Sequence, residues 1–221
     1  HILHAVLRKI LGQHVTQKGS LVLPNKLRFD FSHPKALTRS EIYQIEKEVN
    51  RIIINNSDVI TEIMHADDAS KKGAMALFGE KYGDVVRVVS VGDWARELCG
   101  GTHVTRSGQL GIVKLLGESS IGAGVRRVEA LVGVDAYQFL AREHILLNSL
   151  TELIKGARTE ELPERISDLL NKMKEIEKEL ATVRSAQALS QVGDLAKTAT
   201  VVNGHTFIGS VMADGVSGDD L

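Results

Sequence analysis

The chain has 221 residues, of which 43% are hydrophobic and 25% are charged, and its formal net charge is -1. This composition is typical of a globular protein, and the near-neutral charge excludes a strongly basic nucleic-acid domain. RNA would therefore be contacted through a local patch, and no DNA partner is expected. The single cysteine excludes an internal disulfide framework and fits a reducing, cytoplasmic location. No apolar run is long enough to span a bilayer, so no membrane partner is expected.

The first quarter of the chain predicts two helices on either side of a β-hairpin. Apolar residues recur at helical spacing from His1 to Leu11. Val15–Leu23 and Leu27–Ser32 are separated by a Pro-Asn turn and predict two strands. Thr38 and Glu41 have the spacing of a capping box, which opens a helix that continues to about Ile53.

The next segments predict a larger sheet. Val59–Met64 indicates a short strand, and Asp67–Leu77 a helix with a weak point at its glycine. Val85–Val91 is rich in β-branched residues, as in a strand buried on both faces, and leads into a loop. Strands are also expected at Gly111–Leu116 and Val125–Val132, joined by a glycine-rich connection over 117–124 that lacks the pattern of a phosphate-binding loop. Residues 1–133 are therefore predicted to form an α+β domain with a mostly antiparallel sheet.

Beyond residue 133 the pattern changes to long helices. We expect a first helix up to about Leu153, a connector over 155–163, and an antiparallel coiled-coil hairpin within 134–193. The second helix has a heptad seam made by Ile166, Leu169, Met173, Ile176, Leu180 and Val183. This hairpin would act as a spacer or dimer-forming element, or simply as a solvated helical hairpin. Strands at 199–202 and 205–212 and a helix start at 219–221 predict that 194–221 begins another domain.

A candidate metal site lies at Cys99 and His103, which are four residues apart with two glycines between them. A thiolate and an imidazole at this spacing can fold onto one ion, and Zn²⁺ favours such mixed ligation. Further ligands are offered by His1 and His4, which are three residues apart on one surface of the first helix. The alternative is that Cys99 is a small buried hydrophobic residue.

Several segments, in order along the chain, resemble the editing domain of alanyl-tRNA synthetases, which stand-alone alanyl-tRNA editing proteins share. The family pattern is His-x-x-x-His on a helix, then Gln-x-Gly-Ser, then Cys-x-x-x-His. Here His1 matches the second histidine of the first pair, Gln17–Ser20 the middle element, and Cys99 and His103 the last pair. Further matching stretches are Leu27–Ser32 and Val125–Ala130.

The resemblance implies a zinc site made by His1, Cys99, His103 and a histidine that would lie four residues before His1, outside this chain. We therefore expect a fragment with one ligand missing, unless His4 or water replaces it. The implied reaction is hydrolysis of the ester that joins serine or glycine to the tRNA for alanine, a correction that size selection alone cannot supply. Zinc would polarise a water or the substrate, or orient the terminal adenosine. The catalytic domain that ligates alanine has no counterpart in this chain.

The resemblance also implies roles for other residues. Gln17 would hydrogen-bond the amino acid or its ester, although a strand glutamine usually faces solvent, and Thr102 would recognise the serine hydroxyl or cap the loop. Arg126 would contact a tRNA phosphate or the terminal ribose while its neighbour Arg127 forms a surface pair. We expect the acceptor end of alanine tRNA as the partner.

Strand alternation adds two polar candidates to this tRNA patch. Phe29 and Phe31 should point into the core, while Arg28 and Asp30 point the opposite way and could face a cleft. For Asp30, a surface salt bridge with Arg28 or a neighbour is as well supported as a role in a cleft. Lys18, with Arg28, would extend a basic patch for the acceptor end.

Two other functions compete with the editing enzyme. The incomplete histidine pair would be compatible with a noncatalytic fragment for tRNA binding and assembly. A stand-alone editing protein is the other alternative, but a helical hairpin followed by the start of a further domain favours the synthetase. In that family the further domain contacts tRNA and forms oligomers, so a homo-oligomer is possible through that region.

Overall fold

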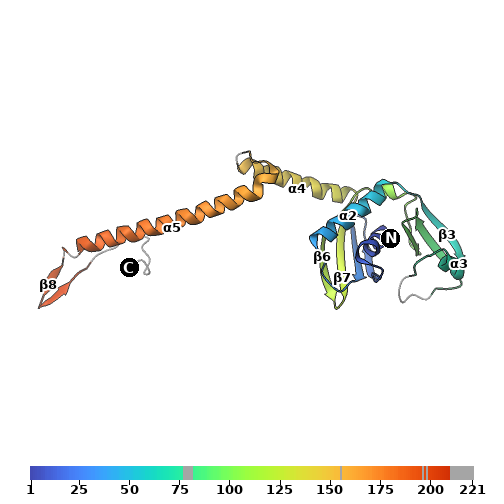
Figure 1. Cartoon of the computed structure of the whole chain (residues 1–221), viewed down its shortest axis with the longest axis horizontal. Coiled ribbons are helices and arrows are strands. Elements are labelled where there is room, and N and C mark those ends of the chain that lie inside the picture. The colour runs from blue at the N-terminus through green and yellow to red at the C-terminus, as the bar shows by residue number, and fades with distance from the viewer. Residues whose placement is uncertain (77–81, 155, 196, 198, 210–221) are drawn as a thin grey trace. The chain divides into compact units, whose positions relative to one another are not determined.

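A computed structural model describes residues 1–76, 82–154, 156–195, 197 and 199–209 (Figure 1). The chain divides into two compact units, His1–His144 and Ile145–Leu221. The expected division into 1–133, 134–193 and 194–221 stays a prediction. The predicted helix start at 219–221 and the end of the last predicted strand lie outside the described residues.

The first unit is an α+β fold with antiparallel sheets, as predicted. Its helices are α1 (Ile2–Leu11), α2 (Arg39–Ile54), α3 (Ala66–Lys71) and the start of α4 (Val134–Leu153). Its strands are β1 (Gln17–Val22), β2 (Lys26–Ser32), β3 (Val59–His65), β4 (Val85–Val91), β5 (Ala95–Leu98), β6 (Val113–Gly122) and β7 (Val125–Val132). The second unit holds the rest of α4, then α5 (Leu162–Leu195), β8 (Thr200–Val202) and β9 (His205–Phe207).

The main core lies between α1, α2 and a four-stranded sheet of order β1-β2-β7-β6. Phe29 and Phe31 in β2 are 5% and 0% exposed, so the predicted core face of this strand is confirmed. Leu7 of α1 and Ile45 of α2 are fully buried in the same cluster. The amphipathic helices therefore bury their apolar stripes against one face of the sheet.

The start of α2 confirms the predicted capping box. The Glu41 backbone N–H donates to Thr38 Oγ1 over 3.1 Å, and the Thr38 N–H donates to the Glu41 carboxylate over 2.7 Å. Two backbone donors that the first turn leaves unpaired are thereby satisfied. This fixes where α2 begins.

The second sheet has the order β3-β4-β5, and it corrects one expectation. Residues 95–98 were expected in a loop, but they form β5, which pairs with β4 from Val88↔Leu98 to Val91↔Ala95. The segment is short and charged, so it lacks the run of apolar residues that marks a strand. Because β5 ends at Leu98, the rigid sheet delivers Cys99 directly.

Two other boundaries differ from the prediction. The expected connection over 117–124 is largely strand, because β6 continues to Gly122 and tolerates two irregularities in its pairing with β7. Its exposed polar residues hide the alternation that predicts strands. Helix α3 ends at Lys71 rather than near residue 77, since Gly73 adopts a φ of 74° and closes the helix.

In the second unit, α5 is one continuous helix that carries the predicted heptad seam. Met173, Ile176 and Leu180 are 56%, 62% and 47% exposed, so the apolar side chains of this seam are not buried within the second unit. Pairing as a coiled-coil hairpin stays a prediction. Among the described residues, no helix has the length and apolar character needed to cross a membrane.

Candidate metal centre

Three predicted ligands come together at the N-terminus of α1 and the end of β5. One ligand atom each from His1, Cys99 and His103 lies within 4.8 Å of the others. The rings of His1 and His103 are 5.0 Å apart between centroids. His1 therefore meets two residues that lie 98 and 102 positions further along the chain, because α1 packs beside β5, which ends just before Cys99.

The donor set fits a zinc ion. His103 Nε2 is buried and has no hydrogen-bond partner among the described residues, which leaves its lone pair for a metal. A Cβ placed on Gly101 would lie 3.5 Å from Cys99 Sγ and 3.7 Å from His103 Nε2, so both atoms converge over this glycine. One sulfur and two imidazole nitrogens are ligands that Zn²⁺ prefers, and a tetrahedral site would have one position open to another ligand.

Arg87, on β4, holds the ligand loop from one side. Its Nη1 donates to the carbonyl oxygens of Cys99 over 2.7 Å and Gly101 over 2.6 Å. Burial lowers the pKa of His103, and the positive charges of His1 and Arg87 lower it further. Both effects favour the neutral imidazole, which is the form that binds metal.

Glu97, on β5, contacts two histidines of α1. Its carboxylate accepts from His1 Nδ1 over 2.5 Å and from His4 Nδ1 over 2.7 Å, and its side chain is 2% exposed. Burial alone would raise the pKa of Glu97, but the hydrogen bonds from His1 and His4 outweigh it and lower that pKa to about 2. The hydrogen bond that His1 donates to Glu97 raises the pKa of His1. His4 thus binds a carboxylate rather than joining the three ligands.

Sequence reasoning missed both Glu97 and Arg87. Arg87 is a charged residue in the apolar strand β4, and Glu97 is one in the short strand β5. For Glu97 the sequence did offer a signal, because it lies two residues before Cys99. On a strand, residues two apart share a face, so Glu97 and Cys99 could have been placed together once β5 was recognised.

Gln17 and Arg126 lie on the same face of the sheet as Phe31. Both are cross-strand partners of Phe31, in β1 and β7, and opposed residues in antiparallel strands share a face. Gln17 Nε2 donates to Ser20 Oγ over 3.1 Å. Arg126 is bound through its Nε to the carboxylate of Glu118. The His4 ring packs against Phe29 with its centroid 5.5 Å away and its plane tilted by 42°, so the metal centre also lies on this side of the sheet.

Asp30 lies on the opposite face. It accepts two hydrogen bonds from the Arg127 guanidinium, over 2.6 and 2.8 Å, so it forms the ion pair with a neighbouring strand that was one alternative. The structure therefore does not bring Asp30 and the three ligands together. Lys18 and Thr102 are exposed, and Arg28 is partly exposed.

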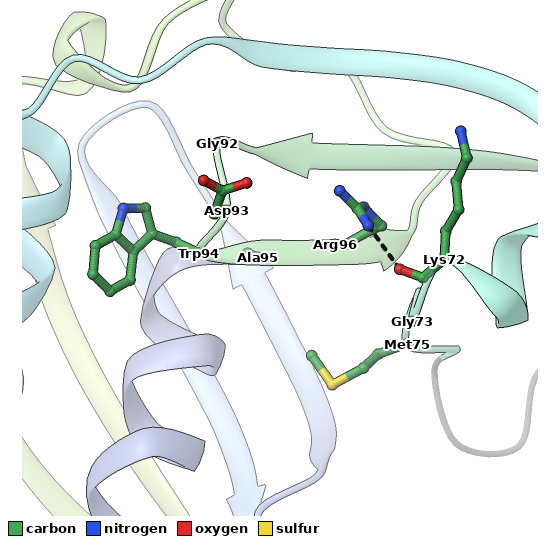
Figure 2. Close-up of a pocket in the computed structure, with 8 residues that line it drawn as sticks. All are labelled: Lys72, Gly73, Met75, Gly92, Asp93, Trp94, Ala95 and Arg96. Carbon is green, nitrogen blue, oxygen red and sulfur yellow. Dashed lines mark hydrogen bonds between the residues drawn. The ribbon is translucent and has the colours of Figure 1, made fainter.

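A separate hollow of about 330 Å³ lies along β5 and the segment after α3 (Figure 2). Its lining includes Trp94, Arg96, Lys72 and Met75. Arg96 closes one side by donating to the Lys72 carbonyl over 2.7 Å and to Ser90 Oγ over 3.1 Å. None of the predicted site residues lines this hollow.

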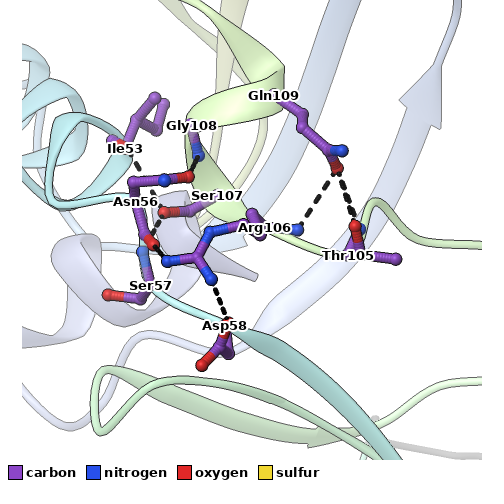
Figure 3. A network of polar contacts seen from close by, with 9 residues as sticks. All are labelled: Ile53, Asn56, Ser57, Asp58, Thr105, Arg106, Ser107, Gly108 and Gln109. Atoms are coloured by element: carbon purple, nitrogen blue, oxygen red, sulfur yellow. Dashed lines mark hydrogen bonds and ion pairs between the residues drawn. The ribbon is translucent and has the colours of Figure 1, made fainter.

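The loop that follows His103 is fixed by a polar network at the C-terminal end of α2 (Figure 3). Arg106 donates to Asp58 and to the Asn56 carbonyl, each over 2.6 Å. Ser107 is fully buried, accepts from the Ser57 N–H over 2.9 Å and lies 3.2 Å from the carbonyls of Ile52 and Ile53. This network anchors the chain four residues beyond His103.

The sequence around this centre matches known proteins. Residues 86–129, which include Cys99 and His103, match the family "Threonyl and Alanyl tRNA synthetase second additional domain". Over all 221 residues the chain is 54% identical to the alanine–tRNA ligase of Nocardioides sp. and covers 24% of it. The chain belongs to the alanine–tRNA ligase family.

Other members of the family match over the same extent. Identity is 49% over 221 residues with the alanine–tRNA ligase of Streptomyces avermitilis and 46% over 222 residues with that of Acidothermus cellulolyticus, and the chain covers 25% of each. The chain thus spans about a quarter of the length of the relatives it matches.

Proposed function

We propose that the chain is an editing hydrolase that releases serine or glycine wrongly attached to the tRNA for alanine. The observation that carries this proposal is the convergence of His1, Cys99 and His103 within 4.8 Å, in a chain of the alanine–tRNA ligase family. Such a site is needed because a pocket for alanine rejects glycine or an added hydroxyl only weakly. The partner is the acceptor end of alanine tRNA, and the proposed location is the cytoplasm.

His1, Cys99 and His103 would hold the ion. Zinc bound there supplies Lewis acidity toward a water or the substrate, or a fixed point for the terminal adenosine. Arg87 keeps the ligand loop in place through the carbonyls of Cys99 and Gly101. The neutral His103 and the metal-facing side of His1 are thereby held within reach of one ion.

The remaining proposed residues act on the substrate. Gln17, on the same side of the sheet as the centre, donates from its amide to the amino acid or its ester. Thr102, exposed in the ligand loop, offers a hydroxyl that distinguishes serine. Arg126 would contact a phosphate or ribose of the acceptor end, with Glu118 fixing its guanidinium. Lys18 and Arg28 would add charge along the RNA path.

Asp30 was proposed for substrate binding as well, but its bidentate pair with Arg127 on the opposite face supports a role in the sheet. Its contribution to tRNA binding would then be indirect. It would set the position of Arg127, which could meet the RNA backbone on that outer face.

The test is release of serine from serine-charged alanine tRNA by the chain and by Cys99→Ala, with bound zinc quantified in both. We expect hydrolysis and about one zinc per chain in the unmodified protein, and loss of both in the variant. The matched control is Ser120→Ala, an exposed hydroxyl on β6 whose loss should change neither quantity. Equal hydrolysis by Cys99→Ala would contradict the proposal.

A noncatalytic role in tRNA binding and assembly is the second candidate, and the exposed seam of α5 favours it. Tight binding of alanine tRNA without hydrolysis or zinc would support this role. Further regions of the relatives, beyond the quarter that the chain matches, would supply alanine ligation and oligomer formation.

A further inference from the structure

Glu97 is a buried carboxylate that meets two imidazoles through equivalent atoms. Both contacts use the Nδ1 nitrogens, at 2.5 Å for His1 and 2.7 Å for His4. The side chain of Glu97 is 2% exposed and that of His4 is 6% exposed, so water cannot easily replace the contact between them. One of these two imidazoles, that of His1, also belongs to the three-ligand group.

The contacts dictate where the imidazole protons lie. An ionised carboxylate only accepts hydrogen bonds, so each Nδ1 must carry its proton and donate it. In neutral His1 the lone pair then belongs to Nε2, the nitrogen left to face Cys99 and His103. His4 Nε2 is buried without a partner among the described residues, as a bare nitrogen in an apolar setting would be.

We infer that Glu97 is a positioning residue that locks His1 with its proton on Nδ1 and its Nε2 lone pair toward the metal. His4 anchors the second carboxylate oxygen and so fixes the rotation of Glu97. The inference rests on the proposed zinc site and deepens it by assigning a supporting carboxylate to this ligand. Carboxylates that bind the far nitrogen of a ligating histidine commonly change metal affinity by about 10- to 100-fold.

Glu97→Gln separates this role from simple packing because it keeps the shape of the side chain. The two histidines meet different oxygens of Glu97, and an amide has an acceptor oxygen at only one of these two positions and an NH2 donor at the other, so it cannot accept from both histidines in this geometry. His4 cannot move its proton to Nε2 without burying an unpaired donor. The change of tautomer therefore occurs in His1, whose ring is the more exposed at 21%. Its proton would move from Nδ1 to Nε2, and Nε2 could then no longer bind the metal.

The first measurement is Zn²⁺ affinity of the whole chain, by competition with a chromophoric chelator. We expect Glu97→Gln to bind Zn²⁺ about 10- to 100-fold more weakly. Glu118→Gln is the matched control, because Glu118 is a carboxylate of similar burial, 5% exposed, that binds Arg126 instead. Its affinity should equal that of the unmodified chain. Equal affinity in Glu97→Gln overturns the inference.

The second measurement needs no variant. Long-range proton–nitrogen NMR of the metal-free chain, at a pH where imidazoles are neutral, distinguishes protonated from bare ring nitrogens. We expect Nδ1 of His1 and of His4 to be protonated and Nε2 of His1 to be bare. A proton on Nε2 of His1 overturns the inference, whether or not Glu97→Gln folds.

The proposed function can fail separately. If zinc binds and depends on Glu97 but serine is not released from its tRNA, the editing proposal fails and the role of Glu97 stands. If the chain binds no zinc, the zinc site is lost, and the proton position in the metal-free chain decides whether Glu97 orders His1.

Discussion

Ser107→Ala tests whether the network beyond His103 holds the domain together. The hydroxyl of Ser107 is fully buried, and it accepts from the Ser57 N–H over 2.9 Å. It also lies 3.2 Å from the carbonyls of Ile52 and Ile53, in the last turn of α2, where carbonyls lack partners within the helix. One small side chain thus satisfies both the end of α2 and the turn that follows it.

The cost of this substitution follows from the groups it leaves unpaired. A buried donor or acceptor that loses its partner costs about 1–3 kcal/mol. The Ser57 N–H loses its acceptor and the Ile52 carbonyl loses its donor, whereas the Ile53 carbonyl keeps the Asn56 N–H, so we expect a loss of about 2–4 kcal/mol in the free energy of unfolding. For a domain of this size, that is a fall of roughly 5–15 °C in Tm.

Urea and thermal unfolding followed by circular dichroism measure this loss. Ser120→Ala is the control, because its hydroxyl is exposed and makes a single 3.3 Å contact, and it should change stability by less than about 0.5 kcal/mol. A loss below about 0.5 kcal/mol in Ser107→Ala as well would refute the reasoning. The network would then be incidental to the position of the ligand loop.

Two further perturbations test the sheet and its ends. Hydrogen bonds from Arg127 lower the pKa of Asp30, so this pair stabilises the fold above the unfolded carboxyl pKa of about 3.9 and is lost as the pH falls through the lower folded value. Unfolding free energies measured across that acid range should fall more steeply with decreasing pH for the unmodified chain than for Asp30→Asn, and equal slopes would contradict the assignment. Gly111→Ala should cost about 1–3 kcal/mol, because φ is 72° there and a Cβ would lie 3.2 Å from the Cα of Gly133. Gly117→Ala, with open space and no positive φ, should cost less in the same unfolding assay, and the reverse order would show that the backbone at 111 is not constrained.

The sequence predicted the elements whose local chemistry is strong. The capping box at Thr38 and Glu41 and the alternation of Phe29 and Phe31 were both confirmed. β5 was missed because four residues with two charges carry no clear periodicity, and its pairing with β4 depends on a distant strand. The local sequence pattern is enough to predict an element when the contacts that stabilise it are made by residues close together in sequence.

In the candidate site, too, the residues close together in sequence could be predicted, and those brought together by the fold could not. Cys99 and His103 could be paired from spacing alone, with His1 and His4 as further candidates, and the resemblance singled out His1, which the structure places beside them. Glu97 could not be found in this way, because its role depends on α1 approaching β5 from the far end of the chain. The ion pair between Asp30 and Arg127 likewise required the register of β2 against β7.

The central claim is that His1, Cys99 and His103 form one zinc site on which ester hydrolysis depends. The most direct measurement is titration of Zn²⁺ into the metal-free chain while serine release from serine-charged alanine tRNA is followed. We expect negligible release without zinc and a rise that saturates at about one equivalent, the occupancy expected of a single three-ligand site. Full release by the metal-free chain, or no release after zinc has bound, would contradict it.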